Sequence, residues 1–156
     1  MSTCRRMAAL ALAGVCGAFA WAAMAGPPRL DPLRESDLAD GCGCSFHVPP
    51  RAGAKGRTIL QWEIDSRATM RLDGRVRKLD VVGVQEASTP ERAARIGDKA
   101  VFELQGADVD VRADCVVTRV CRPDDEACEN VAYRARLKVR TAGGERVVDA
   151  WASCGC

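Results

Sequence analysis

The chain has 156 residues, with 23 Lys or Arg and 21 Asp or Glu, and a formal net charge of +2 at pH 7. Such a small charge gives no global field to hold nucleic acid or an anionic membrane surface, so we expect neither as a partner. With one histidine and no Gly-x-Ser-x-Gly sequence, the chain carries no recognisable catalytic set, and we predict that it is not an enzyme.

The first 25 residues have the pattern of a secretory signal peptide. Arg5 and Arg6 precede an uncharged run over residues 7–21, and Ala23-Met24-Ala25 supplies the small residues of a cleavage site. The alternative is a retained or lipid-linked anchor, although the residue before Cys16 is Val15 rather than a small one. We therefore predict a periplasmic or secreted protein, where cysteines oxidise to disulfides.

Cleavage after Ala25 would remove two arginines and no acidic residue, leaving 131 residues with a formal charge of zero. That length suits one domain. Residues 26–40, with Pro27, Pro28 and Pro32 among charged residues, are predicted to form an extended leader. A single β-domain is then expected over residues 41–156.

Apolar residues alternate with polar ones along most of this domain, as in strands that are buried on one face. A two-residue hairpin turn is predicted at Asp73-Gly74, another turn at residues 142–144, and a short helix from Thr89 to Arg95. The pattern predicts an all-β fold, a small antiparallel barrel or sandwich of about seven or eight strands. The residues expected to face inward are Leu60, Trp62 and Ile64; Ala68, Met70 and Leu72; Ala100, Phe102 and Leu104; Val109 and Val111; and Val131, Tyr133, Ala135, Leu137 and Val139.

Aromatic residues are few after the signal, which predicts a thin core that cross-links would compensate. They are Phe46, Trp62, Phe102, Tyr133 and Trp151.

Seven cysteines follow the signal, and two of them flank a turn. Pro123-Asp124-Asp125 is typical of a turn, so a hairpin centred there would bring Cys121 and Cys128 within disulfide distance. Five cysteines remain, so one is free or bonded to another molecule.

Two Cys-Gly-Cys segments, which we call the clips, begin and end the predicted domain. If they run antiparallel, Cys42 bonds Cys156 and Cys44 bonds Cys154, leaving Cys115 as a possible free thiol. A pairing that involves Cys115 is nearly as good, and the sequence does not choose between them.

The alternative reading makes the clips a metal site. Four thiolates suit copper or zinc, and His47 follows Cys44 by three residues, so it could join them. Redox exchange through a Cys-Gly-Cys pair is a further alternative. We expect structural disulfides and no cofactor, because thiols oxidise in an exported protein unless a metal arrives first.

A basic stripe, formed by Arg134, Arg136, Lys138 and Arg140, alternates with the apolar residues of one predicted strand. It could grip an acidic partner. We interpret it as an exposed sheet face on which Asp108 and Asp110 are available as cross-strand partners.

The opening Gly-Cys-Gly-Cys-Ser-Phe, the central Met70-Arg71-Leu72-Asp73-Gly74 and the final Cys-Gly-Cys resemble a group of small exported proteobacterial proteins without an assigned function. In architecture the chain is also similar to the periplasmic C-type lysozyme inhibitors. Their inhibitory Ser-Gly-x-x-Tyr segment does not occur here, so the resemblance transfers no residue. We expect an exported, non-enzymatic β-domain that binds a protein or an envelope component, with a periplasmic copper- or zinc-binding protein as the alternative.

Overall fold

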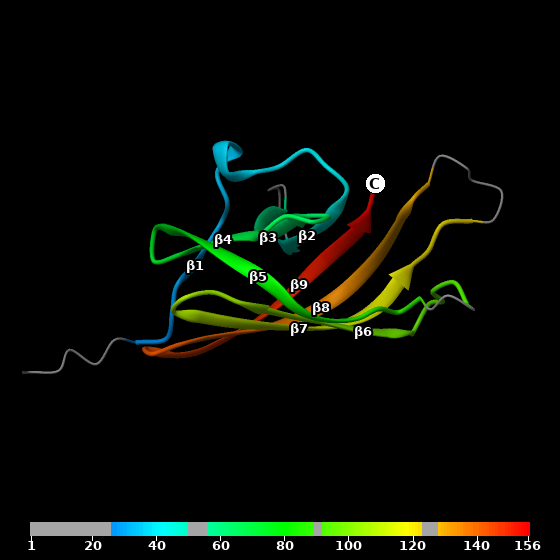
Figure 1. Ribbon diagram of the computed structural model, residues 1–156. Coiled ribbons are helices and arrows are strands. Elements are labelled where there is room, and N and C mark those ends of the chain that lie inside the picture. Colours follow the sequence, from blue (N-terminus) through cyan, green and yellow to red (C-terminus); the bar gives the residue numbers. More distant parts are fainter. Residues whose placement is uncertain (1–25, 50–55, 89–91, 123–127) are drawn as a thin grey trace, which may run out of the picture.

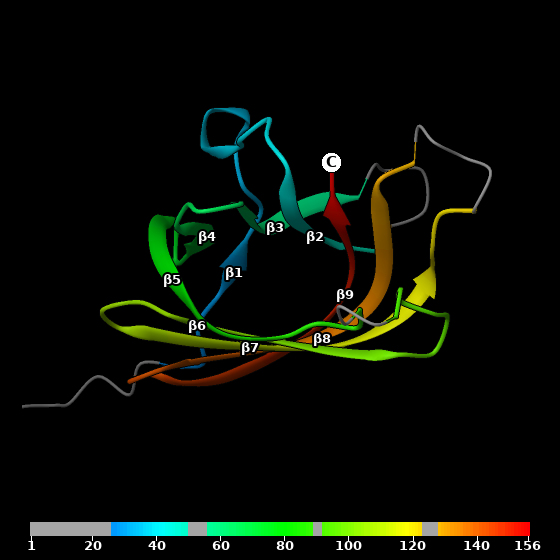
Figure 2. The same ribbon diagram turned by 45° about the vertical axis from the view of Figure 1, so that its right-hand side comes forward.

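The computed structural model describes residues 26–49, 56–88, 92–122 and 128–156. Eight antiparallel strands follow one another around a closed barrel, and pairing between the first and the last of them completes it (Figure 1 and Figure 2). They are β2 Gly43–Val48, β3 Arg57–Glu63, β4 Ala68–Leu72, β5 Arg75–Gln85, β6 Lys99–Gln105, β7 Val109–Arg119, β8 Asn130–Thr141 and β9 Gly144–Gly155. The predicted all-β antiparallel barrel is confirmed.

Alternating side chains fill the barrel, as the sequence pattern predicts. On β8, Tyr133, Ala135, Leu137 and Val139 are buried inside, while the basic residues between them face out. Inward side chains of a small barrel pack it solid, because its interior is only wide enough for them. The turn at Asp73-Gly74 is also confirmed: both residues have positive φ angles (49° and 77°), as a two-residue hairpin turn requires.

The predicted leader is extended, but it belongs to the folded unit. Its strand β1 (Leu30–Asp31) pairs with β4, and a 3-10 turn η1 (Glu35–Asp37) follows. Strands β3 and β4 share only two residue pairs, so β1 takes the edge of β4 that β3 leaves free. The Leu33 N–H then donates to the carbonyl of Thr58 on β3 at 2.8 Å, so the leader bridges both strands.

Docking of the leader changes the environment of the outer face of β4. Arg71 alternates with the predicted inward residues of β4 and was therefore expected to face solvent, but it is buried. The Arg71 guanidinium donates to the Asp37 carboxylate at 2.6 Å. Because both side chains are about nine-tenths shielded from solvent, this ion pair attaches the leader more firmly than a surface pair would.

Two local predictions were wrong. Ile64, expected inside with Leu60 and Trp62, lies in the turn after β3 and is 65% exposed. The helix expected up to Arg95 is absent from its described part, because the Asp98 carboxylate accepts the Arg95 N–H (2.8 Å) within a turn from Arg95 to Asp98. Residues 89–91 of that prediction lie outside the described residues.

Candidate functional site

Both clips lie where the barrel closes, on the facing ends of β2 and β9. Cys44 stands opposite Cys154 with a Cα–Cα distance of 4.1 Å, and Cys42 and Cys156 follow at 4.3 Å. Both pairs are disulfide-bonded, which is the antiparallel one of the two pairings that the sequence left open. The two disulfides therefore join the first and last strands of the barrel.

Close backbone contacts account for the glycine at the centre of each clip. A Cβ atom on Gly43 would lie 2.0 Å from the carbonyl oxygen of Trp62, and one on Gly155 would lie 1.9 Å from that of Glu129. Neither position has room for a side chain. The central glycine of each clip is thus explained by one closely packed neighbouring segment, β3 for Gly43 and residues 129–130 for Gly155.

The other three cysteines are placed as predicted. Cys121 and Cys128 form a disulfide with a Cα–Cα distance of 5.5 Å, just beyond the ends of β7 and β8. Cys115 is a free thiol that points into the core from β7. Burial, with a contribution from the neighbouring Asp114 carboxylate, raises the pKa of the Cys115 thiol to about 12, so it is protonated and unreactive at neutral pH.

The structure does not bring His47 to the clip cysteines. His47 pairs with the exposed Trp151 on the outer face, whereas Cys44 points inward with the buried Phe46. The His47 ring hydrogen-bonds through Nδ1 to Thr58 Oγ1 at 3.1 Å, and burial lowers the pKa of His47. In the folded barrel a clip metal site would therefore lack this ligand, and its four thiols are taken up by disulfides.

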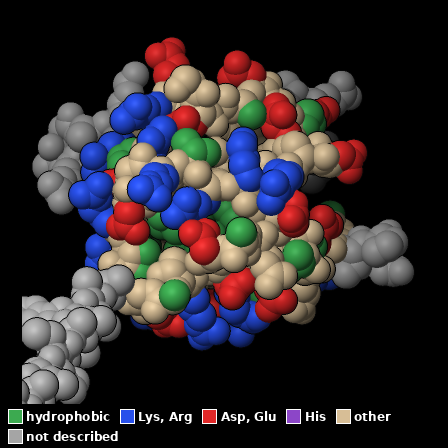
Figure 3. Space-filling view, turned by 60° about the vertical axis from the view of Figure 1, so that its left-hand side comes forward, with side chains coloured by type: hydrophobic (Ala, Val, Ile, Leu, Met, Phe, Trp, Pro, Cys, Tyr) green, Lys and Arg blue, Asp and Glu red, His purple; other side chains and the backbone are tan. Residues whose placement is uncertain are grey.

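The basic stripe on β8 is an exposed face, as expected, and Asp110 lies directly opposite Arg140 in the β7–β8 pairing, but Asp108 is not one of its partners. Lys138 contacts Asp114 at 3.4 Å and Arg140 contacts Glu145 at 2.6 Å. Asp108 instead pairs with Arg77 at 3.1 Å, because it lies in the turn before β7. On the face seen in Figure 3, basic and acidic side chains are interspersed, which is typical of a solvated surface.

Four of the five aromatic residues after the signal gather at the clip end of the barrel. Phe46 stacks on Trp62 with ring centres 5.4 Å apart, and Phe102 packs edge-on against Trp62 at 5.4 Å. Tyr133 extends the series from the other side of Phe102 at 6.4 Å. The scarce large rings of this chain are thus concentrated at one end of its core.

An apolar pit opens at this end, and we call it the mouth. It has a volume of about 300 Å³. Buried rings form its floor, the Cys44–Cys154 disulfide forms part of its wall, and exposed aliphatic side chains stand at its rim. Its lining residues include Trp62, Ile64, Val84, Phe102, Val131 and Tyr133.

Tyr133 gives the mouth a polar group. Burial raises the pKa of its hydroxyl to about 12, and the nearby Cys115 and Glu86 add to this shift. The hydroxyl is therefore a protonated donor at neutral pH. Glu86 also lines the mouth, and it lies close in sequence to Val84, one of the exposed side chains at the rim.

The sequence did not predict the mouth, because its residues come from six strands and from the segments between them. The only available signal was that Phe46, Trp62 and Tyr133 would each fall near a clip once the strands were paired.

Comparisons with protein-family models, curated proteins and solved structures found no match. Within the described ranges, no helix is long and apolar enough to cross a membrane.

Proposed function

We propose that this protein is an exported, non-enzymatic binding domain that holds a partner protein at the mouth of its barrel. The observation that carries the proposal is the apolar pit at the clip end, open to solvent and floored by aromatic rings. Concave apolar sites with a few polar groups are the usual binding sites of proteins. Export is supported by the signal-like residues 1–25 and by three disulfides.

A protein fits the mouth better than a small molecule, because the pit rises from buried rings to strongly exposed apolar side chains at its rim. Ile64 and Val84 at the rim are 65% and 53% exposed, whereas Phe102 and Tyr133 below are 5% exposed. A partner that inserts one apolar side chain would also cover the rim. Such an anchor, buried in a pocket and surrounded by contacts that exclude water, is the usual centre of a protein interface.

Polar groups at the mouth would orient the partner. The Tyr133 hydroxyl has no hydrogen-bond partner among the described residues, so it is free to donate to a backbone carbonyl of the bound segment. Glu86 would favour a basic residue beside the apolar anchor. We therefore expect the partner to present an apolar side chain next to a lysine or arginine.

The clip disulfides would contribute by rigidity rather than by chemistry. Cys44 and Cys154 form part of the wall, and their bond fixes the distance between β2 and β9. A wall that is rigid before binding loses little conformational freedom when the partner arrives. Reduction should therefore weaken binding even where the fold survives.

Site-specific photocrosslinking in the cells that naturally make the protein tests this function. A photoreactive residue at position 64 or 84 should give one discrete adduct with the same protein. The matched control is position 147, because Val147 is also an exposed valine (40%) but lies on the outer face of β9. Placing an aspartate at the other rim position, as in Val84→Asp with the probe at 64, should abolish the adduct.

Equal adducts at position 147, or none at positions 64 and 84, would contradict the proposal. Because both rim side chains are exposed, the substitutions should change the thermal midpoint little, so loss of the adduct cannot be attributed to unfolding.

A further inference from the structure

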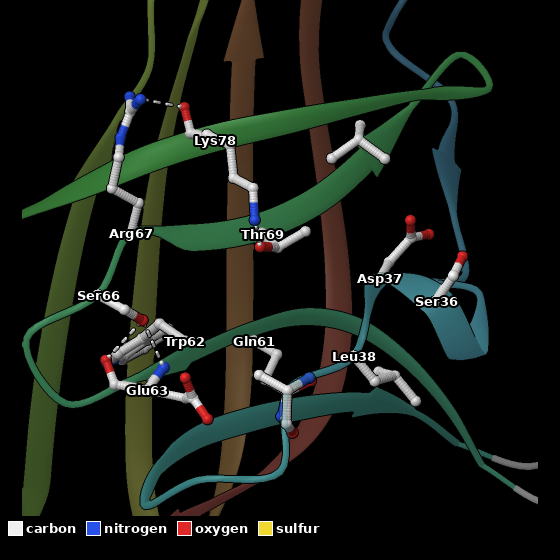
Figure 4. A pocket seen from close by; sticks show the side chains of 12 residues that line it. Ser36, Asp37, Leu38, Gln61, Trp62, Glu63, Ser66, Arg67, Thr69 and Lys78 are labelled. Atoms are coloured by element: carbon white, nitrogen blue, oxygen red, sulfur yellow. Dashed lines mark hydrogen bonds between the residues drawn. The ribbon is translucent and has the colours of Figure 1, made fainter.

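A second hollow lies on the outside of the barrel, between the leader and strands β3 to β5 (Figure 4). Its volume is about 530 Å³. Residues 36–39 form one wall, and side chains from the outer face of the strands form the other. The Gln61 side chain holds the leader wall in place, because its amide donates to the Ala39 carbonyl at 2.6 Å and accepts the Ala39 N–H at 3.4 Å. We call this hollow the outer groove.

Four charged side chains line the outer groove, and two of them are neutralised by the protein itself. Asp37 accepts from Arg71 at 2.6 Å, and Arg67 donates to Asp80 at 2.7 Å. These two pairs leave no net charge. What the groove offers to a ligand is therefore decided by the remaining two charges.

The remaining two are Lys78 and Glu63, and neither forms an ion pair within the described part of the chain. The Lys78 ammonium donates to Thr69 Oγ1 at 2.6 Å, which leaves two of its three N–H donors unused. In Figure 4, Lys78 comes from β5 on one side of the groove and Glu63 from the end of β3 on the other. The groove thus presents one free cation and one free carboxylate at separate positions.

We propose that the outer groove binds a small zwitterion, namely an amino acid or dipeptide with a free ammonium and a free carboxylate. The ligand carboxylate would accept from Lys78, and its ammonium would donate to Glu63; hydrogen bonds between charged groups are the strong ones. The exposed side chains of Leu38 and Val76 also line the groove and would receive an aliphatic side chain. The volume lies in the range of roughly 300–1,000 Å³ that is usual for small-molecule sites.

Isothermal titration of the oxidised mature protein with alanyl-leucine tests this site. The free dipeptide should bind, and N-acetylation or C-amidation should each weaken binding by about tenfold or more, the effect of one hydrogen bond to a charged group. Trp62, which also lines the groove, provides an independent fluorescence signal.

Two variants test which residue of the groove binds each charged end of the dipeptide. Lys78→Gln should weaken binding of the free dipeptide, and this variant should bind the free and the C-amidated dipeptide equally well. Glu63→Gln should likewise weaken binding of the free dipeptide, and it should bind the free and the N-acetylated dipeptide equally well. Lys99→Gln is the matched control, because Lys99 is an exposed lysine on β6 outside the groove. Lack of binding at millimolar alanyl-leucine, or equal binding by the native protein and both groove variants, would overturn the proposal. The photocrosslinking result at the mouth is independent of either outcome.

Discussion

The barrel is completed at two places, and the two are held by different means. Where β2 meets β9, five residue pairs are reinforced by two disulfides. Where β3 meets β4, only two residue pairs form, and the docked leader supplies the missing contacts through β1 and the Asp37–Arg71 ion pair. We call these the covalent seam and the leader seam. The first joins residues more than 100 positions apart, so it restricts the unfolded chain strongly.

The difference means that the two seams should respond to different conditions. Reduction breaks the covalent seam and leaves the leader seam intact, whereas acid protonates the carboxylates of the leader seam and leaves disulfides intact. The mouth lies beside the covalent seam, and the outer groove is walled by the leader. Each proposed site therefore depends on its own seam.

The largest expected effect comes from removing the covalent seam. Replacing Cys42, Cys44, Cys154 and Cys156 together by alanine should lower the free energy of unfolding by about 5 kcal/mol or more, because loops of over 100 residues are then no longer closed in the unfolded state. Urea unfolding followed by tryptophan fluorescence measures this loss.

The control is the variant that lacks only Cys42 and Cys156. It should lose about 2 kcal/mol, because Cys44–Cys154 still closes nearly the same loop. An unchanged urea midpoint in the fourfold variant would show that the ends of the domain are not coupled.

The leader seam should be weaker. Asp37→Asn removes the charge that accepts from Arg71 at 2.6 Å and from the Arg34 N–H at 2.9 Å, and should cost about 1.5 to 3 kcal/mol, the scale of hydrogen bonds to a charged group. Asp40→Asn, at an exposed aspartate in the same segment, should cost almost nothing. Equal unfolding midpoints for the two variants would mean that the ion pair does not hold the leader.

The hairpin disulfide offers a comparison with the covalent seam. Cys121→Ala with Cys128→Ala opens a loop with a sequence separation of only seven residues, so the expected loss is about 2 kcal/mol. Differential scanning calorimetry under non-reducing conditions measures it. If this variant lost as much stability as the fourfold clip variant, the loop-length account of the covalent seam would be wrong.

Of the two seams, acid should loosen only the leader seam, because the disulfides of the covalent seam carry no carboxylate to protonate. The hydrogen bond from Arg71, together with the Arg34 N–H, lowers the pKa of Asp37 below its ordinary value of 3.8. This contribution to stability is complete above pH 3.8 and is lost as the pH falls through the lower pKa of the folded state. The NMR shift of the Arg34 amide should therefore titrate below pH 3.8. A midpoint at or above that value would contradict the assignment.

Much of the barrel was predictable, because strands leave local signals. Alternation placed Phe102, Leu104 and Leu137 inside, and Asp73-Gly74 marked a tight turn. The sequence left the clip pairing open, since a pairing that involves Cys115 was nearly as good; the burial of Cys115 in the core decides between them.

The leader and the two proposed sites were not predictable, because they depend on long-range contacts. Nothing near Asp37 indicates that Arg71, 34 residues later, is its partner. Ile64 continues the apolar alternation of β3, yet the strand ends one residue earlier, at Glu63. The chain turns there, and Asp65 in this turn has a positive φ of 61°. Turn formation there overrides the periodicity, and the exposed isoleucine becomes part of the mouth.

Counting thiols in protein from its native compartment tests the central claim, that disulfides close the barrel and frame the mouth, most directly. Alkylation under denaturing conditions without reduction, read by intact mass, should modify Cys115 alone, and reduction should then expose the other six cysteines after the signal. Alkylation of the four clip cysteines without reduction, together with stoichiometric copper or zinc in elemental analysis, would contradict the account. It would make the clips a thiolate metal site, because a thiol cannot serve as a metal ligand and a disulfide at once.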